Sequence, residues 1–176
     1  MRRLIALALF VPTLLWNLLL ARVLRVRHWW DRIDDHVLMG ALPFSWDVPK
    51  MKQEGVGAVV NTCSEYAGPQ QAYDEADIVQ LRLPTVDFTA PSLADVERGV
   101  AFMDEQIVQG RDVYVHCKAG RARSATIVLC WLIAAKGITP EEGQKWILEK
   151  RPHAHRHLVE RQVVQDFWKK HGGGNV

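Results

Sequence analysis

One segment constrains the fold of this chain more than any other. Residues 111–115 are an apolar, β-branched run typical of a buried strand, and residues 124–136 are an apolar run typical of a buried helix. The sequence HCKAGRAR, residues 116–123, joins them. A tight loop that leads from a strand into a helix N-terminus offers unpaired N–H groups and the positive end of the helix dipole. The segment therefore predicts an anion site at the end of a buried strand.

Two side chains of this loop are suited to phosphoryl chemistry. Cys117 opens the loop, where N–H groups, the helix dipole and nearby arginines should lower the pKa of its thiol. Arg123 can curl around the same loop, and its planar fork can hold two phosphate oxygens at once. Gly120 permits a backbone turn that a Cβ would strain. A thiolate, a ring of N–H groups and a forked cation around one anion predict phosphoryl transfer to cysteine.

The motif resembles a known family. A Cys-x5-Arg-Ser sequence preceded by His, here residues 116–124, is similar to the protein tyrosine phosphatase superfamily in its dual-specificity branch. Basic residues at Lys118 and Arg121 resemble the lipid-directed members. Residues 37–43 (VLMGALP) and 81–87 (LRLPTVD) also resemble mitochondrial phosphatidylglycerophosphate phosphatases of that branch. The resemblance covers roughly residues 35–170, and it implies an α/β fold, a phosphocysteine intermediate and no cofactor.

Each residue of the motif receives an expected role. Cys117 attacks phosphorus, and Arg123 with the loop N–H groups holds the equatorial oxygens in the transition state. Ser124 is expected to donate a hydrogen bond to the sulfur as the sulfur leaves, or to serve only as the helix cap. His116 is expected to orient the loop and tune the pKa of the thiol, or to be a histidine of the core. The remaining loop residues are expected to bind the substrate: Lys118, Ala119, Gly120, Arg121 and Ala122.

A general acid must reach the site from elsewhere in the chain, because the leaving oxygen needs a proton. Asp87 is the candidate, since it follows the predicted strand 78–83 and should emerge at the same edge as Cys117. The resemblance also implies a general acid on a loop near this position. Asp74, Asp77 and Glu65 are weaker candidates.

Three further groups of residues carry open alternatives. Cys63 is a buried strand residue or, as the resemblance to phosphoinositide phosphatases implies, a partner for a reversible disulfide with Cys117; Cys130 is expected in the core. Arg151 and Arg156 are candidates for phosphate or headgroup contacts. The spacing of His153, His155 and His157 could suggest a metal, but no cysteine or carboxylate partner is evident, so we predict no metal site.

The N-terminus predicts a membrane segment. Residues 4–21 contain no charged side chain, and a helix of that length would span about 27 Å. Arg22, Arg25, Arg27 and the pair Trp29-Trp30 follow it and are typical of interfacial anchors. We divide the chain into an anchor (residues 1–30) and a catalytic domain (residues 31–176), with the domain on the cytoplasmic side. A cleaved signal peptide, a targeting presequence and a buried helix are the alternatives.

Strands alternating with helices predict a central, mostly parallel sheet of about four to five strands flanked by helices. We expect residues 31–35 to be a short connection. We expect strands at residues 36–41, 56–63, 78–83 and 111–115. We expect helices at residues 48–54, 70–76, 124–136, 140–150 and 157–170, and one more helix that starts at the capping box 92–95 and is stopped by Gly110.

Net charge and cysteine count argue against two classes of protein, those that bind nucleic acid and those held together by disulfides. A net charge of +2 gives no reason to expect nucleic-acid binding, and three cysteines cannot form a disulfide framework. We therefore expect a metal-independent phosphatase acting on an anionic phospholipid, with phosphatidylglycerophosphate as the substrate that the resemblance implies. A dual-specificity protein phosphatase, a phosphoinositide phosphatase and a phosphate-binding pseudophosphatase are the alternatives. The sequence does not predict an oligomeric state.

Overall fold

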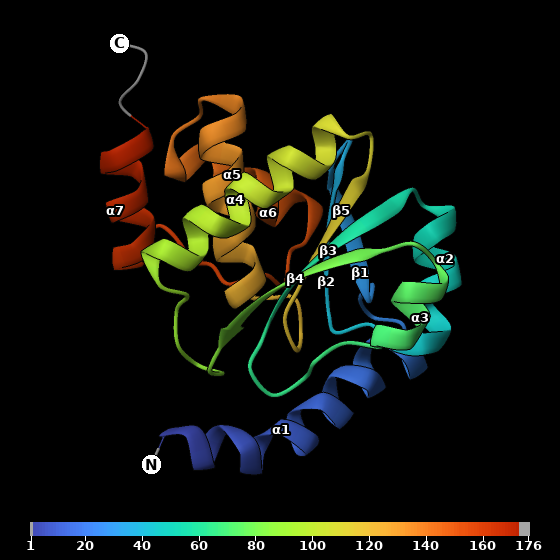
Figure 1. The fold of residues 1–176 in the computed structure, drawn as a ribbon. Helices are drawn as coiled ribbons and strands as arrows, with labels where there is room; N and C mark the ends of the chain where they lie inside the picture. Colours follow the sequence, from blue (N-terminus) through green and yellow to red (C-terminus); the bar gives the residue numbers. More distant parts are fainter. Residues whose placement is uncertain (1, 173–176) are drawn as a thin grey trace.

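The predicted α/β fold is confirmed. The computed structural model describes residues 2–172, with side chains described from Phe10 onward. Its centre is one five-stranded sheet in the order β1-β2-β5-β3-β4 (Figure 1), in which β1 is antiparallel to β2 and the other neighbours are parallel. The strands are β1 Trp30–Asp34, β2 Val37–Gly40, β3 Val56–Cys63, β4 Val79–Thr85 and β5 Asp112–His116.

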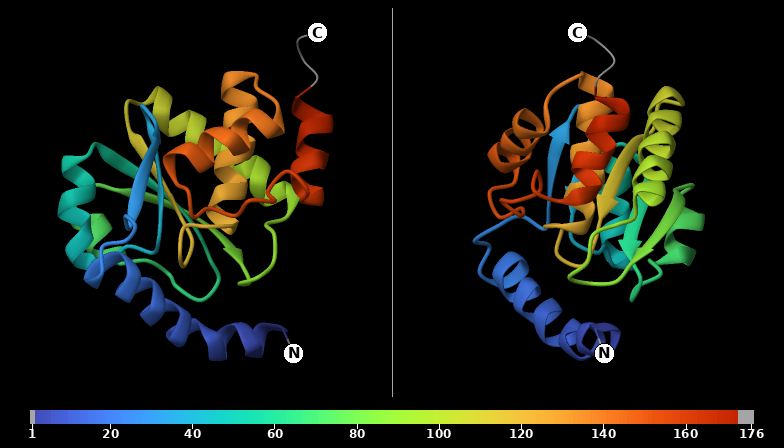
Figure 2. Two further views of the ribbon diagram at one scale, coloured as in Figure 1. Left: turned by 180° about the vertical axis from the view of Figure 1, so that it is seen from behind. Right: turned by 90° about the vertical axis from the view of Figure 1, so that its left-hand side faces the viewer.

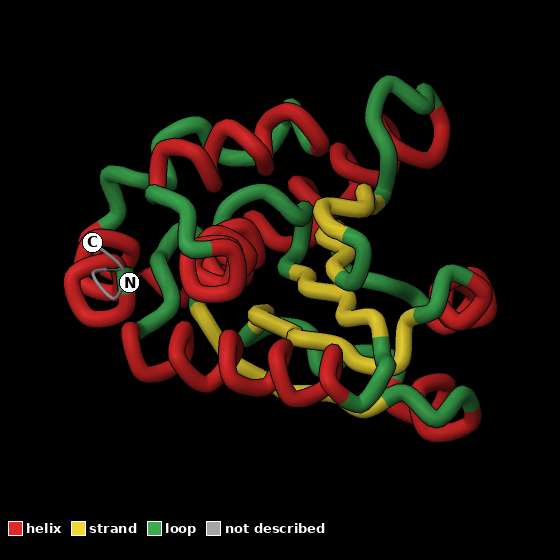
Figure 3. Tube along the Cα trace, turned by 90° about the horizontal axis from the view of Figure 1, so that it is seen from above, coloured by secondary structure: helices red, strands yellow, loops and turns green. Residues whose placement is uncertain are grey.

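Helices cover both faces of the sheet, as the view from above shows (Figure 3). The helices after the first are α2 Val48–Gln53, α3 Gln70–Glu75, α4 Leu93–Val108, α5 Arg123–Lys136, α6 Pro140–Lys150 and α7 Gln162–His171. Their starts follow the expected caps: Ser92 accepts a hydrogen bond from the Asp95 N–H at 3.1 Å, and Thr139 forms a capping box with Glu142.

Alternation along the central strands divides the core in two. On β5, Val113 and Val115 pack with α4, α5 and α7, whereas Tyr114 between them packs with α2 and α3 on the opposite face. All eight residues of β3 are buried, which is expected of a strand covered on both sides. The sheet thus holds β5 and the loop after it between two packed layers.

Two expectations about elements were wrong. Residues 31–35 were predicted to be a connection, but residues 31–34 belong to the edge strand β1. Charged side chains of this strand pair with distant residues, Arg32 with Asp112 and Asp34 with Lys136. The last helix was predicted from residue 157 but begins at Gln162. Just before it, the N–H groups of residues 158 and 159 donate to the Gln144 side chain, which replaces helical hydrogen bonds.

The N-terminal segment packs on the domain. Helix α1, Arg2–Leu18, continues into a π-helical turn, Leu19–Val23, and runs below the sheet (Figures 1 and 2). Within residues 2–172, no helix combines the length and the apolar character needed to cross a membrane. The expectation of Trp29 and Trp30 as interfacial anchors was wrong, because both are buried and their ring N–H groups donate to the Leu42 carbonyl and Glu54.

Candidate active site

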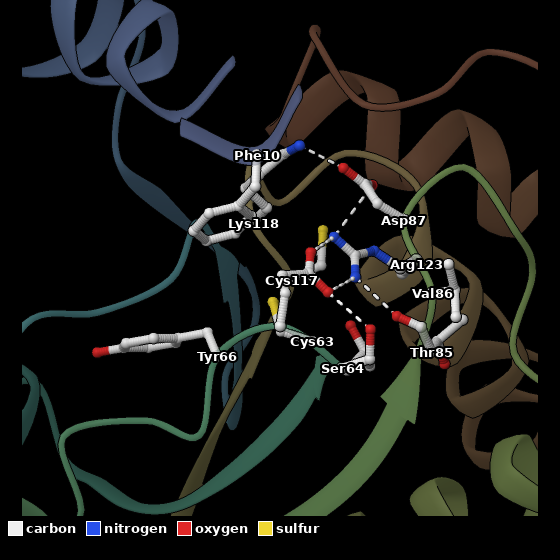
Figure 4. A network of polar contacts seen from close by, with 12 residues as sticks. Phe10, Cys63, Ser64, Tyr66, Thr85, Val86, Asp87, Cys117, Lys118 and Arg123 are labelled. Atoms are coloured by element: carbon white, nitrogen blue, oxygen red, sulfur yellow. Dashed lines mark hydrogen bonds and ion pairs between the residues drawn. The ribbon is translucent and has the colours of Figure 1, made fainter. Parts of the chain in front are cut away.

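Three parallel strands deliver the functional side chains to one edge of the sheet. Cys117 directly follows β5, and Asp87 and Glu65 lie within two residues of the ends of β4 and β3. The carboxyl ends of parallel strands meet at one edge, which is where α/β folds bind their ligands. Figure 4 shows Cys117, Asp87 and Arg123 converging there.

The Cys117 thiol is poised for ionisation. Burial by itself would raise its pKa, but the charge of Arg123 and hydrogen bonds from Ser124 and the Arg121 N–H outweigh burial and lower the pKa to about 7. The Ser124 hydroxyl donates to the Cys117 sulfur at 3.4 Å. Near neutral pH a substantial fraction of the sulfur is therefore thiolate, the form that attacks phosphorus.

The loop is folded tightly against the rest of the sheet. Gly120 has φ +63°, and a Cβ there would lie 2.3 Å from the Gly40 carbonyl carbon, so a side chain is excluded. Arg151 donates to the carbonyls of Gly120 at 2.7 Å and Ala119 at 3.2 Å from behind the loop. With these two carbonyls held on the outer side, the loop keeps its shape around the sulfur.

Arg123 is held by two elements besides its own helix. It is 2% exposed and donates to both Glu65 carboxylate oxygens, at 2.8 and 3.0 Å, and to the Thr85 carbonyl at 2.8 Å. Burial by itself would lower the pKa of Arg123, but Cys117, Glu65 and Asp87 raise it above its ordinary value. The guanidinium is thus a permanent charge with a fixed direction.

Asp87 reaches the site as its position in the sequence predicted. One of its oxygens lies 3.0 Å from Arg123, and the other accepts a hydrogen bond from Lys118 (Figure 4). The Lys118 ammonium also lies 5.4 Å from the ring centre of Phe88 and 5.6 Å from that of Phe10 in α1. Lys118 therefore connects the loop, the Asp87 segment and the N-terminal helix.

His116 lies behind the loop. It is fully buried, and its ring stacks on Tyr114 with centroids 5.8 Å apart. Burial lowers its pKa to about 3, helped by the charge of Arg123, so the imidazole is neutral. This geometry fits a residue that supports the loop; its effect on the thiolate stays a prediction.

A pocket of about 420 Å³ opens above Cys117. Of the loop residues predicted to bind substrate, Lys118, Ala119, Arg121 and Ala122 line it, whereas Gly120 does not. No motif in the sequence indicated the opposite wall. That wall is formed by residues of α1 and its following linker and by two residues near α7: Thr13, Trp16, Asn17, Arg27, His155 and Arg161.

Glu65 is the functional residue whose role the sequence analysis missed. It was considered as a weaker candidate for the acid, yet it is the carboxylate that orients Arg123. Its position just after β3 could have indicated this, because that strand neighbours β5 in the sheet. Asp74 and Asp77, the two remaining candidates for the acid, do not line the pocket.

The remaining candidates lie outside the pocket or stay open. Arg151 is buried behind the loop rather than facing phosphate, and Arg156 is exposed. In the part of the chain that the structure describes, no three His, Cys, Asp or Glu side chains are grouped as metal ligands. Cys63 and Cys117 are both free thiols, and burial holds the pKa of Cys63 well above its ordinary value. A peroxide-induced disulfide between them stays a prediction, testable by a non-reducing peptide map.

Comparisons with known proteins agree with this geometry. Residues 41–137 match the family model described as "Polymorphic toxin system, DSP-PTPase phosphatase". Phosphatidylglycerophosphate phosphatase PTPMT2 of Arabidopsis thaliana is 41% identical over 90% of this chain and 71% of its own length. This chain belongs to the DSP-PTPase phosphatases. It is therefore a phosphoric monoester hydrolase of the cysteine-dependent type.

Two further comparisons, one with a sequence and one with a solved structure, cover most of this chain. Phosphatidylglycerophosphatase and protein-tyrosine phosphatase 1 of Mus musculus is 38% identical over 94% of this chain and 91% of its own length. The crystal structure of PTPMT1 in complex with PI(5)P superimposes with a TM-score of 0.74 at 37% identity, covering 81% of this chain and 96% of that one.

Proposed function

We propose that this phosphatase hydrolyses the terminal phosphomonoester of phosphatidylglycerophosphate to give phosphatidylglycerol, through a phosphocysteine intermediate. The observation that carries the proposal is the Cys117 sulfur, whose pKa is lowered to about 7, at a pocket where Arg123 is held by Glu65. The thiolate and the guanidinium supply the nucleophile and the charge stabilisation that the reaction needs, so the proposed mechanism requires no metal.

In the first step, a substrate phosphate enters between Cys117 and Arg123. It competes with Asp87 for Arg123 and Lys118, which both contact that carboxylate in the structure. The released Asp87 takes up a proton from solvent and holds it within reach of the leaving oxygen. The thiolate attacks phosphorus, the S–P bond forms, the P–O bond to the glycerol breaks, and the alkoxide takes the Asp87 proton.

In the second step, water replaces the lipid. Asp87, now a carboxylate, takes a proton from the water as its oxygen attacks the phosphocysteine. The S–P bond breaks and the sulfur leaves as thiolate, which the Ser124 hydroxyl stabilises from 3.4 Å. Inorganic phosphate departs, Asp87 gives its proton back to solvent, and its carboxylate pairs with Arg123 and Lys118 again.

The choice of a lipid rests on the pocket and its surroundings. Lys118 and Arg121 add cations beyond Arg123 around the sulfur, which suits a substrate with more than one negative group. Two relatives at 38–41% identity are named as phosphatases of phosphatidylglycerophosphate. An apolar lipid-facing surface adjoins the pocket and is formed by exposed side chains of α1 and its linker: Val11, Leu15, Trp16, Leu19, Val23, Leu24 and Val26.

We propose that this apolar surface rests on a bilayer and that residues 1–30 serve as the membrane-binding part, with residues 31–176 as the catalytic domain. Exposed apolar patches of this kind mark membrane or partner contacts. Phe88, 70% exposed beside Asp87, extends the surface to the acid loop. The pocket would then open where a lipid headgroup is presented, on the cytoplasmic side of the membrane.

A phosphate-release panel tests the proposal, with the full-length protein beside Cys117→Ser. The substrates are phosphatidylglycerophosphate, phosphatidylinositol 5-phosphate and phosphotyrosine or phosphothreonine peptides. We expect the highest kcat/KM on phosphatidylglycerophosphate and no turnover by the variant. Faster hydrolysis of the peptides would make this a protein phosphatase, and faster hydrolysis of the inositol lipid would make it a phosphoinositide phosphatase. Turnover that survives in Cys117→Ser would reject the mechanism.

A further inference from the structure

The cations of the pocket fall into two groups. Arg123 and Lys118 already have carboxylate partners, Glu65 and Asp87. Arg27, Arg121 and Arg161 line the same pocket, and no carboxylate pairs with any of them among the side chains described from residue 10 to residue 172. These three arginines have no counter-charge within the described protein. The part of the pocket that they line is therefore suited to an anion in addition to the phosphate at Cys117.

Arg27 is the clearest member of the second group. Its Nη2 donates to the Asn17 side-chain oxygen at 2.5 Å, while its Nε is buried without a hydrogen-bond partner. Burial lowers the pKa of Arg27, and the charges of Arg121 and Arg151 lower it further. A buried N–H of a charged group costs free energy unless an acceptor completes it.

Asn17 points to the same missing acceptor. It is 3% exposed on a helix that is otherwise largely apolar, and it lines the pocket beside Arg27. Its oxygen is occupied by Arg27, which fixes the orientation of the amide, and its Nδ2 is buried without a partner. Both unpartnered atoms are N–H donors, so the group that would satisfy them is an acceptor, and the surrounding charge selects an anion.

We propose that Arg27 and Asn17, with Arg121 beside them, form a second anion subsite that takes the phosphodiester of the lipid headgroup while Cys117 and Arg123 take the phosphomonoester. The subsite rests on the proposed function, because phosphatidylglycerophosphate carries both groups on one glycerol. It also gives α1 a role in substrate binding, since the acyl chains beyond the phosphodiester would run onto the apolar lipid-facing surface of that helix.

Binding of two soluble probes tests the subsite without a membrane. Glycerophosphoglycerol phosphate, the deacylated headgroup, carries a monoester and a diester, whereas glycerol 3-phosphate carries the monoester alone. Affinities are measured by calorimetry on full-length Cys117→Ser protein, with and without Arg27→Gln. We expect Arg27→Gln to lower the affinity ratio of the two probes by about tenfold, the usual effect of losing one charge-assisted hydrogen bond.

Two further variants make the result specific. Arg25→Gln removes an exposed arginine of the same linker that does not line this pocket, and it should leave the ratio unchanged. Asn17→Leu keeps the helix apolar and removes the other donor, so it should also lower the ratio, and thermal melts verify the fold of both pocket variants. An unchanged ratio in Arg27→Gln, or an equal loss for both probes, would overturn the subsite.

The outcome is separable from that of the proposed function. Turnover of phosphatidylglycerophosphate against phosphopeptides reports on the substrate, and the probe ratio reports on the subsite. A falling ratio in a protein that prefers phosphopeptides would keep the subsite and remove the lipid assignment. A preference for the lipid together with an unchanged probe ratio would keep the lipid assignment and remove the subsite.

Discussion

The two walls of the pocket differ in how their charges are satisfied. On the wall built by the strand ends, Arg123 is 2% exposed and is held by Glu65, Asp87 and a backbone carbonyl. On the wall built by α1 and its linker, Arg27 and Asn17 keep buried donors without partners. The charges of the first wall are paired in the absence of substrate, whereas the second wall keeps unpartnered donors, which we propose are completed by the second anion of the substrate.

This difference separates chemistry from selection. Electrostatic catalysis needs groups that do not reorganise during the reaction. Glu65 and the Thr85 carbonyl meet that need, because they still hold Arg123 after the substrate displaces Asp87. Discrimination between substrates needs groups that remain unsatisfied when the wrong substrate binds, and the α1 wall meets that need. Loss of Glu65, which fixes Arg123, should therefore lower the rate on every substrate, and loss of the acid Asp87 should depend only on the leaving group. Changes to the second wall should affect some lipid headgroups more than others.

The largest effect is expected from Asp87→Ala. Loss of a general acid typically costs about 10²–10⁴-fold in rate. The loss should be large for alkyl phosphates and small for aryl phosphates, whose leaving groups need little protonation. Steady-state kinetics on both substrates measure it, with Asp74→Ala, an exposed aspartate on α3, as the control. Equal losses on the two substrates would assign the proton to another donor.

The next largest effect on activity is expected from Glu65→Gln. It keeps the shape of the side chain but removes the charge that pairs with Arg123 at 2.8 Å. We expect kcat to fall about 10- to 100-fold on lipid and aryl substrates alike, because a misdirected guanidinium stabilises every phosphoryl transition state less well. Glu75→Gln makes the same change at an exposed position on α3 and should have little effect. A fall in kcat on the lipid alone would show that Glu65 contributes to substrate discrimination rather than to the chemistry common to all substrates.

The pH dependence of Cys117 probes the first wall without any substrate. Its pKa is lowered to about 7, so the thiolate fraction falls as the pH drops below 7, to about one tenth at pH 6. The rate of alkylation by iodoacetamide should follow this fraction, with a midpoint near pH 7. Ser124→Ala removes a hydrogen bond to the sulfur and should move the midpoint upward. A midpoint near the ordinary value for cysteine would contradict the assigned environment.

The smallest effect is expected from the lipid-facing surface. Val11 and Leu15 are 57% and 59% exposed, and replacing both with Gln should weaken binding to anionic vesicles. We expect turnover of vesicle-borne lipid to fall several-fold and turnover of a soluble aryl phosphate to stay the same. Val108→Gln alters an equally apolar, 88% exposed side chain on α4 and is the matched control in co-sedimentation and activity assays. Similar behaviour of both proteins would show that α1 does not bind the bilayer.

The sequence by itself determined the parts of the molecule that depend on short stretches of chain. The strand before Cys117, the loop, the helix after it and the parallel core follow from apolar runs, caps and glycines that lie close together in sequence. Asp87 could also be predicted, because a residue just after a parallel strand must emerge at the common edge of the sheet.

Only the tertiary structure decided the pairings between distant residues. Glu65 holds Arg123 across 58 positions and Arg151 supports the loop from 31 positions away, and no local pattern specifies which charges meet. The polar pattern of residues 31–35 predicted a connection, and that prediction was wrong. The partners that neutralise the charges of this strand lie far away in the sequence, so the local pattern does not reveal them. In the same way, only the packing of α1 beside the pocket brings Asn17 and Arg27 near Cys117. Local sequence encodes backbone conformation and burial, whereas a site depends on which side chains the folded backbone brings together.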